Sequence, residues 1–280
     1  MFNKLNIFKT IYKMETQQIN NVVVKPVPIE KKHQSVKGSD LFINCYSNIF
    51  LLGKKHSGKS SVIWSIVRKC IDKNTKVIIF CSTLFKDDTY ICIRKYLESK
   101  KIEFEYYTSI VDGKSNILNE LILDMQGEIS DDNESSSEDE PEIVQFSNGR
   151  KYKKRKPKPP KVLAPKYLII FDDISGELSK NPAVNVLLKQ NRHYKCKTVI
   201  SSQYIHDLTP MARKNLDNWL VFPGINTDKL ERLYLDADVN LTMQKFLELY
   251  NNACAEKYNF LYIDVNKPEY RKNFNQKYLI

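Results

Sequence analysis

One short stretch restricts the folds open to this chain more than any other: residues 49–52 are all apolar, and Gly53 follows them directly. After four further residues comes Gly-Lys-Ser at 58–60, so the stretch satisfies the pattern G-x-x-x-x-G-K-[ST] at every fixed position. A glycine at each end lets the backbone turn sharply and bring its N–H groups close to an anion. Residues 61–71 lack glycine and proline and repeat their apolar positions at helical spacing. The stretch therefore predicts a phosphate-binding loop between a strand and a helix, with the positive end of the helix dipole at the phosphates.

The side chains of the loop suit a nucleoside triphosphate and its metal ion. Lys59 is expected to reach the β- and γ-phosphates as a positive charge, and the Ser60 hydroxyl is expected to ligate Mg²⁺. The predicted cofactors are therefore ATP and Mg²⁺. The residues expected to bind them are Gly53, Lys54, Lys55, His56, Ser57, Gly58, Lys59, Ser60 and Ser61. The alternative is a chance Gly-Lys-Ser turn in a basic protein, and the flanking strand and helix patterns count against it.

A second apolar run ends in acids. Residues 167–171 are mostly branched or aromatic, and Asp172 and Asp173 follow them. Such a run predicts a buried parallel strand, a Walker B strand, and ligands of open α/β sheets bind at the carboxyl ends of such strands. Asp172 is expected to hold Mg²⁺, directly or through water, and Asp173 to orient or deprotonate the attacking water. By itself, an apolar run that ends in two aspartates is weak evidence for a Walker B strand. Together with the phosphate-binding loop it is stronger, because Lys59 and Asp172 would carry opposite charges at one metal–nucleotide site.

A further strand is expected at residues 198–202, and Gln203 ends it. Here the chain resembles the additional-strand ATPases, the group that contains RecA-like motors. The resemblance implies that this strand lies between the phosphate-loop strand and the Walker B strand, and that Gln203 senses the γ-phosphate. Without the resemblance, Gln203 reads as a surface amide at the end of a strand.

The whole chain predicts one large domain with appendages, because 280 residues, 42% of them hydrophobic, can supply a core of that size. The predicted fold class is α/β: a RecA-like additional-strand P-loop ATPase core, with a mostly parallel sheet and helices on both faces. The ATPase domain is expected at 41–265, between a basic N-terminal arm at 1–40 and a basic, aromatic tail at 266–280. Residues 226–251 are expected to be helical. The tail is expected either to stack on nucleic acid or to dock as a partner peptide.

A charged insert interrupts this domain at about residues 127–163. Residues 128–142 include eight acidic residues and no basic one, whereas residues 150–161 include eight basic residues, three prolines and no acidic residue. This composition predicts disorder. The two charge runs cancel, so the net charge of +11 lies on the rest of the chain. This excess of positive charge favours a polyanionic partner, nucleic acid first and an acidic membrane surface second. The alternative is that the lysines serve only to keep the protein in solution.

The cysteines and the hydropathy indicate the compartment. The six cysteines are scattered, without a C-x-x-C pair, so neither a disulfide framework nor a metal cluster is indicated. They read as reduced thiols of an intracellular protein. No stretch approaches the length of apolar residues that a membrane span needs, and no secretory signal is visible at the start. We therefore expect an intracellular protein that is not secreted and has no membrane partner.

Four segments together resemble one family: GKKHSGKSS, LIIFDD, NRHYK leading into TVISSQ, and DLTPMARKNLDNWLVF. They are similar to the viral DNA-packaging ATPases of the FtsK–HerA superfamily, in the poxvirus-type branch found in large DNA viruses, virophages and polinton-like elements. The resemblance covers about residues 44–222. It implies a homo-oligomeric ring that hydrolyses ATP to drive double-stranded DNA into a capsid, with capsid or portal proteins as further partners. The implied location is the host-cell cytoplasm, at the site of virus assembly, or the virion.

The resemblance also implies roles for single residues. The catalytic set that it implies is Lys59, Asp172, Asp173, Gln203, Arg192 and Arg213. One of the two arginines is expected to act as an arginine finger on a neighbouring subunit, and the sequence does not say which. Many members of the family have Asp-Glu where this chain has Asp172-Asp173, so the role of the second carboxylate as a base stays open. The long insert before the Walker B strand is a further departure from the family.

Two other kinds of protein fit a phosphate-binding loop. A nucleotide or nucleoside kinase needs an arginine-rich lid and an acceptor pocket, and the proline-rich insert makes a poor lid. A binding module would hold the nucleotide as a structural switch without translocating DNA. The intact set of Lys59, Ser60, Asp172 and Gln203 argues against such a decayed ATPase.

Overall fold

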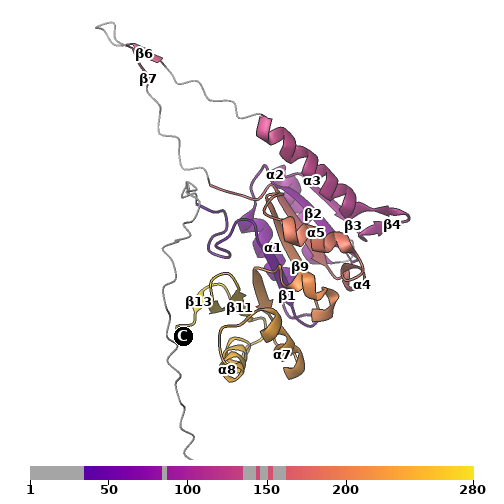
Figure 1. The fold of residues 1–280 in the computed structure, drawn as a ribbon, viewed down its shortest axis with the longest axis vertical. Coiled ribbons are helices and arrows are strands. Elements are labelled where there is room, and N and C mark those ends of the chain that lie inside the picture. The colour runs from indigo at the N-terminus through magenta and orange to yellow at the C-terminus, as the bar shows by residue number, and fades with distance from the viewer. Residues whose placement is uncertain (1–34, 84–86, 135–142, 146–150, 154–161) are drawn as a thin grey trace, which may run out of the picture. The chain divides into compact units, whose positions relative to one another are not determined.

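The computed structural model describes residues 35–83, 87–134, 143–145, 151–153 and 162–280. Most of the predicted N-terminal arm therefore lies outside the described residues. The described part contains a nine-stranded sheet in the order β13-β12-β11-β10-β1-β9-β8-β2-β3 (Figure 1). Its strands are β1 (Asn48–Leu52), β2 (Lys76–Cys81), β3 (Phe104–Tyr107), β8 (Tyr167–Asp172), β9 (Cys196–Ser202), β10 (Asn218–Val221), β11 (Leu261–Asp264), β12 (Glu269–Lys272) and β13 (Gln276–Lys277).

The six strands from β10 to β3 are parallel, and the three from β11 to β13 are antiparallel. The predicted sheet, mostly parallel, is thus confirmed. Strand β9 lies between β1 and β8, as the additional-strand arrangement requires. In the register, Ser202 pairs with Leu52 and Ser201 with Asp172. The carboxyl ends of the three strands that carry the predicted motifs therefore meet at one edge of the sheet.

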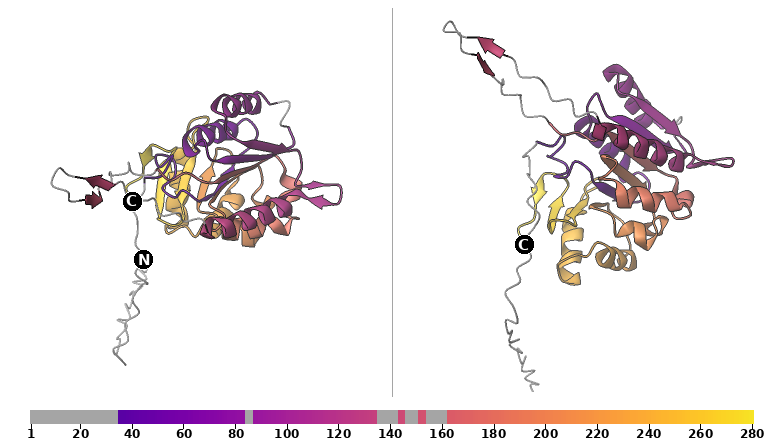
Figure 2. Two further views of the ribbon diagram at one scale, coloured as in Figure 1. Left: turned by 90° about the horizontal axis from the view of Figure 1, so that it is seen from above. Right: turned by 45° about the horizontal axis from the view of Figure 1, so that its top comes forward.

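Helices cover both faces of this sheet, with α1 and α2 on one face and α3 and α5 on the other (Figures 1 and 2). The helical elements are α1 (Lys59–Cys70), α2 (Asp88–Lys100), α3 (Ile117–Glu134), α4 (Ser175–Leu178), α5 (Pro182–Gln190), η1 (Ile205–Asp207), α6 (Pro210–Arg213), α7 (Thr227–Asp236) and α8 (Met243–Ala253). Strand β1 shows why its apolar run is unbroken. Ile49 and Leu51 pack into one hydrophobic cluster and Phe50 and Leu52 into the other, because successive side chains of a strand point to opposite faces.

The charged insert is partly described. Helix α3 continues to Glu134, beyond the predicted start of the insert at 127. Strands β6 (Ile143–Gln145) and β7 (Lys151–Lys153) pair as a separate antiparallel hairpin, and a second small hairpin joins β4 (Val111–Asp112) to β5 (Ser115–Asn116). Within the described residues, no helix has both the length and the apolar composition that crossing a membrane requires.

The prediction of continuous helix over 226–251 is wrong. Helix α7 ends at Asp236, and α8 begins at Met243. Between them Asp238 adopts a left-handed φ of 47°, and the Thr242 hydroxyl accepts a hydrogen bond from the N–H of Lys245 as an N-cap. An N-cap residue starts a new helix because it satisfies a free N–H of the first turn. The chain therefore reverses here rather than continuing as one long helix.

The C-terminal segment also differs from the prediction of a separate tail at 266–280. Strands β12 and β13 extend the main sheet from β11. Tyr270 is only 4% exposed, and the Phe274 ring packs edge-on against Phe42 with centroids 5.5 Å apart. Because these aromatic rings fill the core, they are not available to stack on nucleic acid. The segment belongs to the folded domain.

Candidate active site

The loop between β1 and α1 is shaped by its two glycines. Gly58 adopts a φ of 104°, which side-chain-bearing residues rarely tolerate. At Gly53, a Cβ would come within 2.6 Å of the Phe222 Cβ and 2.7 Å of the Ser57 hydroxyl oxygen. No side chain of the described residues caps the first turn of α1. Its free N–H groups and the positive helix end are therefore open to an anion.

Lys59 lies at the start of α1 and folds back over the loop. Its ammonium donates hydrogen bonds to the carbonyl oxygens of Gly53, at 2.7 Å, and Lys54, at 2.8 Å. Burial lowers the pKa of Lys59, and the negative charges of Asp172 and Asp173 oppose that shift. The Ser57 hydroxyl is buried and has no hydrogen-bond partner among the described residues. A polyphosphate oxygen fits this arrangement, since it would accept from both side chains.

The Walker B carboxylates lie next to the loop and differ from each other. Asp172, the last residue of β8, is 8% exposed and accepts a hydrogen bond of 2.7 Å from the Tyr90 hydroxyl. Burial raises the pKa of Asp172, and the nearby Ser201, Tyr90 and Lys59 side chains oppose this shift. Asp173 is exposed and adopts a left-handed φ of 53°. Uncommon backbone conformations of this kind concentrate at functional sites.

One cleft of about 740 Å³ brings most of the predicted site residues together. Its lining includes Lys55, His56, Ser57, Gly58, Lys59, Ser60, Ser61, Asp172, Asp173 and Gln203. Two residues of the loop do not line it: Gly53 is buried in the turn, and the Lys54 side chain lies against Gly224. Lys54 thus contributes its carbonyl, which holds Lys59, rather than its charge.

The cleft also suits Mg²⁺. Ser60 and Asp172 both line it and offer the oxygen ligands that this ion prefers. No group of three or more His, Cys, Asp or Glu side chains that could hold a metal occurs in the part of the chain that the structure describes. A magnesium ion would therefore depend on nucleotide phosphates and water for its other ligands, which is its usual manner of binding.

The two candidate finger arginines lie outside the cleft. Arg192 donates a hydrogen bond of 3.0 Å to Asp217, and its side chain is 64% exposed. Asp217 directly precedes β10 and also accepts from the N–H of Asn48, the first residue of β1. Arg192 is thus at the amino edge of the sheet, opposite the edge that carries the phosphate-binding loop.

Arg213 has a different environment. Its side chain is 2% exposed, and its Nε donates to Asp236 at 2.7 Å. Its Nη1 donates to the carbonyl oxygen of Ile205 at 3.3 Å. The Arg213 guanidinium is thus held on several sides by residues between η1 and α7. Of the two candidate finger residues, only Arg192 is exposed.

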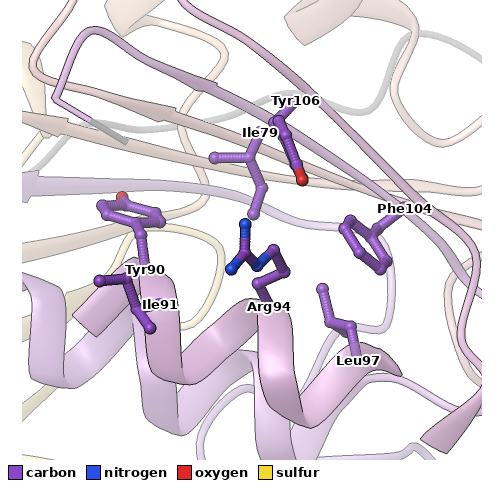
Figure 3. Close-up of a pocket in the computed structure, with 7 residues that line it drawn as sticks. All are labelled: Ile79, Tyr90, Ile91, Arg94, Leu97, Phe104 and Tyr106. Atoms are coloured by element: carbon purple, nitrogen blue, oxygen red, sulfur yellow. The ribbon is translucent and has the colours of Figure 1, made fainter. Parts of the chain in front are cut away.

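Sequence reasoning missed several residues of the cleft. They are Thr83, Asp87, Asp88, Thr89, Ser201, Ser202 and Tyr258 in its lining, and Tyr90 behind it. Figure 3 shows Tyr90 on α2, facing Ile79 of β2 and Tyr106 of β3 across a small cavity of about 110 Å³. Nothing in the sequence marks Tyr90, because its partner Asp172 is 82 residues away along the chain.

Comparison with known proteins points to viruses. No protein-family model matches the chain. The uncharacterized protein 015R of Frog virus 3 (isolate Goorha) is 26% identical over 102 residues, which are 36% of this chain and 31% of that protein. The uncharacterized protein 075L of Invertebrate iridescent virus 6 is 30% identical over 78 residues, 28% of this chain and 30% of that protein. The chain thus matches less than a third of the length of either relative.

The solved structures give the fold. The genome packaging NTPase B204 from Sulfolobus turreted icosahedral virus 2, in complex with AMP, has a TM-score of 0.51 and 17% identity. Its complex with AMPPCP gives a TM-score of 0.50 and 18% identity. Both comparisons cover 82% of this chain and 98% of that protein. The chain therefore has the P-loop ATPase fold of that viral NTPase.

Proposed function

We infer that the protein is an ATP-hydrolysing motor that translocates double-stranded DNA and packages a viral genome into a capsid. The observation that carries this function is the meeting of three predicted motifs in one cleft, around an additional strand. Lys59 follows the loop after β1, Asp172 ends β8 and Gln203 follows β9, and all three line that cleft. The fold shared with a viral genome packaging NTPase supports the same function, as does the viral origin of the relatives.

The residues of the cleft divide the work of hydrolysis. The loop N–H groups and Lys59 bind the β- and γ-phosphates and offset their charge, and Ser60 and Asp172 would hold Mg²⁺. Bound Mg²⁺ neutralises charge that develops on the phosphate oxygens. Asp173 orients the attacking water, and Gln203 contacts the γ-phosphate and senses its loss.

Completion of the site requires a second subunit. Arg192 is exposed at the amino edge and cannot reach the cleft of its own subunit, so it acts on the γ-phosphate of a neighbour in a homo-oligomeric ring. Asp217 orients it without burying it. This arrangement links hydrolysis in one subunit to the position of the next, as a ring motor requires.

The charge of the chain supports DNA binding. The net charge of +11 suits a ring that contacts the phosphate backbone without reading sequence. Capsid or portal proteins are the further partners that a packaging role needs. The poxvirus-type branch of the FtsK–HerA superfamily is the family to which we assign the chain, and the host-cell cytoplasm or the virion is its place of action.

The test is ATP hydrolysis with and without long double-stranded DNA, together with the solution mass in the presence of nucleotide. We expect DNA to stimulate hydrolysis and the nucleotide to promote a multimer. Lys59→Ala should abolish turnover in a folded protein, whereas Lys245→Ala, at an exposed lysine on α8, should not. Hydrolysis indifferent to DNA favours a nucleotide switch. Turnover only with a small phosphate acceptor favours a kinase.

A further inference from the structure

An exposed tyrosine stands out in the lining of the cleft. Tyr258 lies in the turn between α8 and β11, and it is 56% exposed. It lines the same cleft as the phosphate-binding loop, whose own lining side chains are polar. Its φ of 71° is an outlier for a bulky residue. The chain thus presents a flat apolar ring to a polar site, in a strained backbone conformation.

The ring lies beside the loop itself. A Cβ built on Gly58 would be 3.4 Å from Cδ1 and 3.6 Å from Cβ of Tyr258, so the tyrosine packs against the last glycine of the loop. A ligand group that extends from phosphates bound at the loop toward Tyr258 would contact the tyrosine ring.

The turn that carries Tyr258 is well anchored. The Asn259 side-chain amide donates to Glu256 at 2.9 Å and accepts from Asn273 at 2.9 Å. The Asn273 side-chain oxygen also accepts from the N–H of Phe260 at 3.1 Å. These bonds fix the residues on both sides of the tyrosine, so that it is held in place before a ligand arrives. A preorganised aromatic ring loses little entropy on binding.

We propose that Tyr258 is the platform on which the nucleobase of the bound triphosphate stacks. This assignment rests on the proposed function, which places a nucleoside triphosphate in the cleft. The Lys257 ammonium lies over the ring, 4.7 Å from its centroid, and Tyr258 is 56% exposed with that lysine in place. Stacking on a π-face tolerates different bases and grows with the size of the ring system. Purine triphosphates therefore bind alike, and more tightly than pyrimidine triphosphates.

A matched control exists in the same chain. Tyr204 is 54% exposed and has the Lys229 ammonium 5.1 Å from its ring centroid, but it does not line the cleft. If exposure and a neighbouring lysine were sufficient for an effect on nucleotide binding, both tyrosines would show it. Stacking predicts an effect at Tyr258 alone.

The test compares Mg·ATP with Mg·tripolyphosphate, which lacks the base and ribose, by equilibrium binding. Tyr258→Ala should weaken ATP binding about tenfold, the size of one stacking contact, and should leave tripolyphosphate binding unchanged. Tyr258→Phe should bind ATP like the wild type because it keeps the ring. Tyr204→Ala should also bind both ligands like the wild type.

A spectroscopic readout reports the contact directly. In Tyr258→Trp, a stacked base should quench the fluorescence of the new indole, and tripolyphosphate should not. The two native tryptophans supply the background, measured in the wild type.

Each contrary result has one meaning. Unchanged ATP affinity in Tyr258→Ala, together with loss of both ligands in Lys59→Ala, overturns the platform and keeps the phosphate site. Equal weakening of both ligands in Tyr258→Ala also overturns it, since the tyrosine then only supports the loop. Failure of the wild type to bind either ligand removes the proposed function and this inference with it.

Discussion

Two buried aspartates at opposite edges of the sheet show how this protein separates chemistry from stability. Asp172, at the carboxyl edge, is 8% exposed and accepts a hydrogen bond from Tyr90 while lining the cleft. Asp217, at the amino edge, is 6% exposed. Its Oδ2 accepts from the N–H of Asn48 at 2.8 Å, and its Oδ1 accepts from Asn266 at 2.6 Å and from Arg192 at 3.0 Å.

The difference lies in what each carboxylate still offers. Both oxygens of Asp217 are used to join β1, β10 and the segment after β11, so its charge stabilises the fold. Asp172 lines the cleft, and its burial is an energetic cost that Lys59 offsets in part and that a bound metal ion would offset further. In this pair, the carboxylate that lines the cleft is the candidate ligand, whereas the carboxylate with both oxygens hydrogen-bonded within the protein stabilises the sheet. Arg192 is paired with Asp217 and is also exposed, so it is the residue that we propose acts on a neighbouring subunit.

The largest expected effect is the loss of hydrolysis when Arg192 is replaced. It tests whether a residue at the amino edge of the sheet takes part in catalysis. Arg192→Ala should lower the hydrolysis rate by about 10³–10⁵, the usual contribution of an arginine finger. Arg232→Ala is the matched control, since Arg232 is 49% exposed and also pairs with an aspartate, Asp236. Steady-state hydrolysis by both variants checks the prediction.

Subunit mixing sharpens this result. Arg192→Ala and Lys59→Ala should partly restore hydrolysis when mixed, because some interfaces then combine an intact Lys59 with an intact Arg192. Failure to complement, with normal assembly of the mixture, would show that Arg192 does not act between subunits.

The next effect concerns Asp172. Asp172→Asn should reduce hydrolysis by about 10²–10³, because the amide supplies no charge to Mg²⁺. Its stability at neutral pH should match or exceed that of the wild type, since an Asn oxygen can still accept from Tyr90. Hydrolysis and chemical denaturation are measured on the same preparation. Hydrolysis within tenfold of the wild type contradicts the metal-holding role.

Replacing Asp217 should lower stability and leave ATP binding unchanged. Asp217→Ala leaves the buried N–H of Asn48 and the amide of Asn266 without their acceptor, which should lower the free energy of unfolding by about 3 kcal/mol. ATP affinity at low temperature should not change. A variant as stable as the wild type would show that the amino edge does not need this carboxylate.

The smallest expected effect is a difference between the wild type and Asp172→Asn in how stability depends on pH. Burial raises the pKa of Asp172 above its ordinary value of 3.8, so folding favours the protonated carboxyl. The stability gained from this is complete below the ordinary pKa and is lost as pH rises through the raised value. Without nucleotide or metal, the wild type should therefore lose stability relative to Asp172→Asn over that window. Denaturation curves that stay parallel with pH would contradict this.

The sequence was sufficient for the central strands and their motifs. The apolar runs at 49–52 and 167–171 lead into the phosphate-binding loop and into Asp172, and the strand at 198–202 leads into Gln203, so both the strands and the shared edge were predictable. The position of β9 between β1 and β8 followed from the resemblance to additional-strand ATPases.

The remaining features depend on contacts between distant parts of the chain. The pairing of Arg213 with Asp236 and of Tyr90 with Asp172 leaves no local pattern. Strand β12 has only Tyr270 as a buried residue among four, so its composition reads as a basic tail. The break before α8 rests on a left-handed Asp238 without glycine or proline, the usual signals of a turn.

The measurement that tests the central claim most directly is ATP-dependent displacement of a third strand from a DNA triplex. A motor that tracks along the duplex should strip the third strand when ATP is hydrolysed. We predict displacement by the wild type with Mg·ATP, and none by Lys59→Ala or with a non-hydrolysable analogue. DNA binding and hydrolysis without displacement would show that the cleft does not drive translocation.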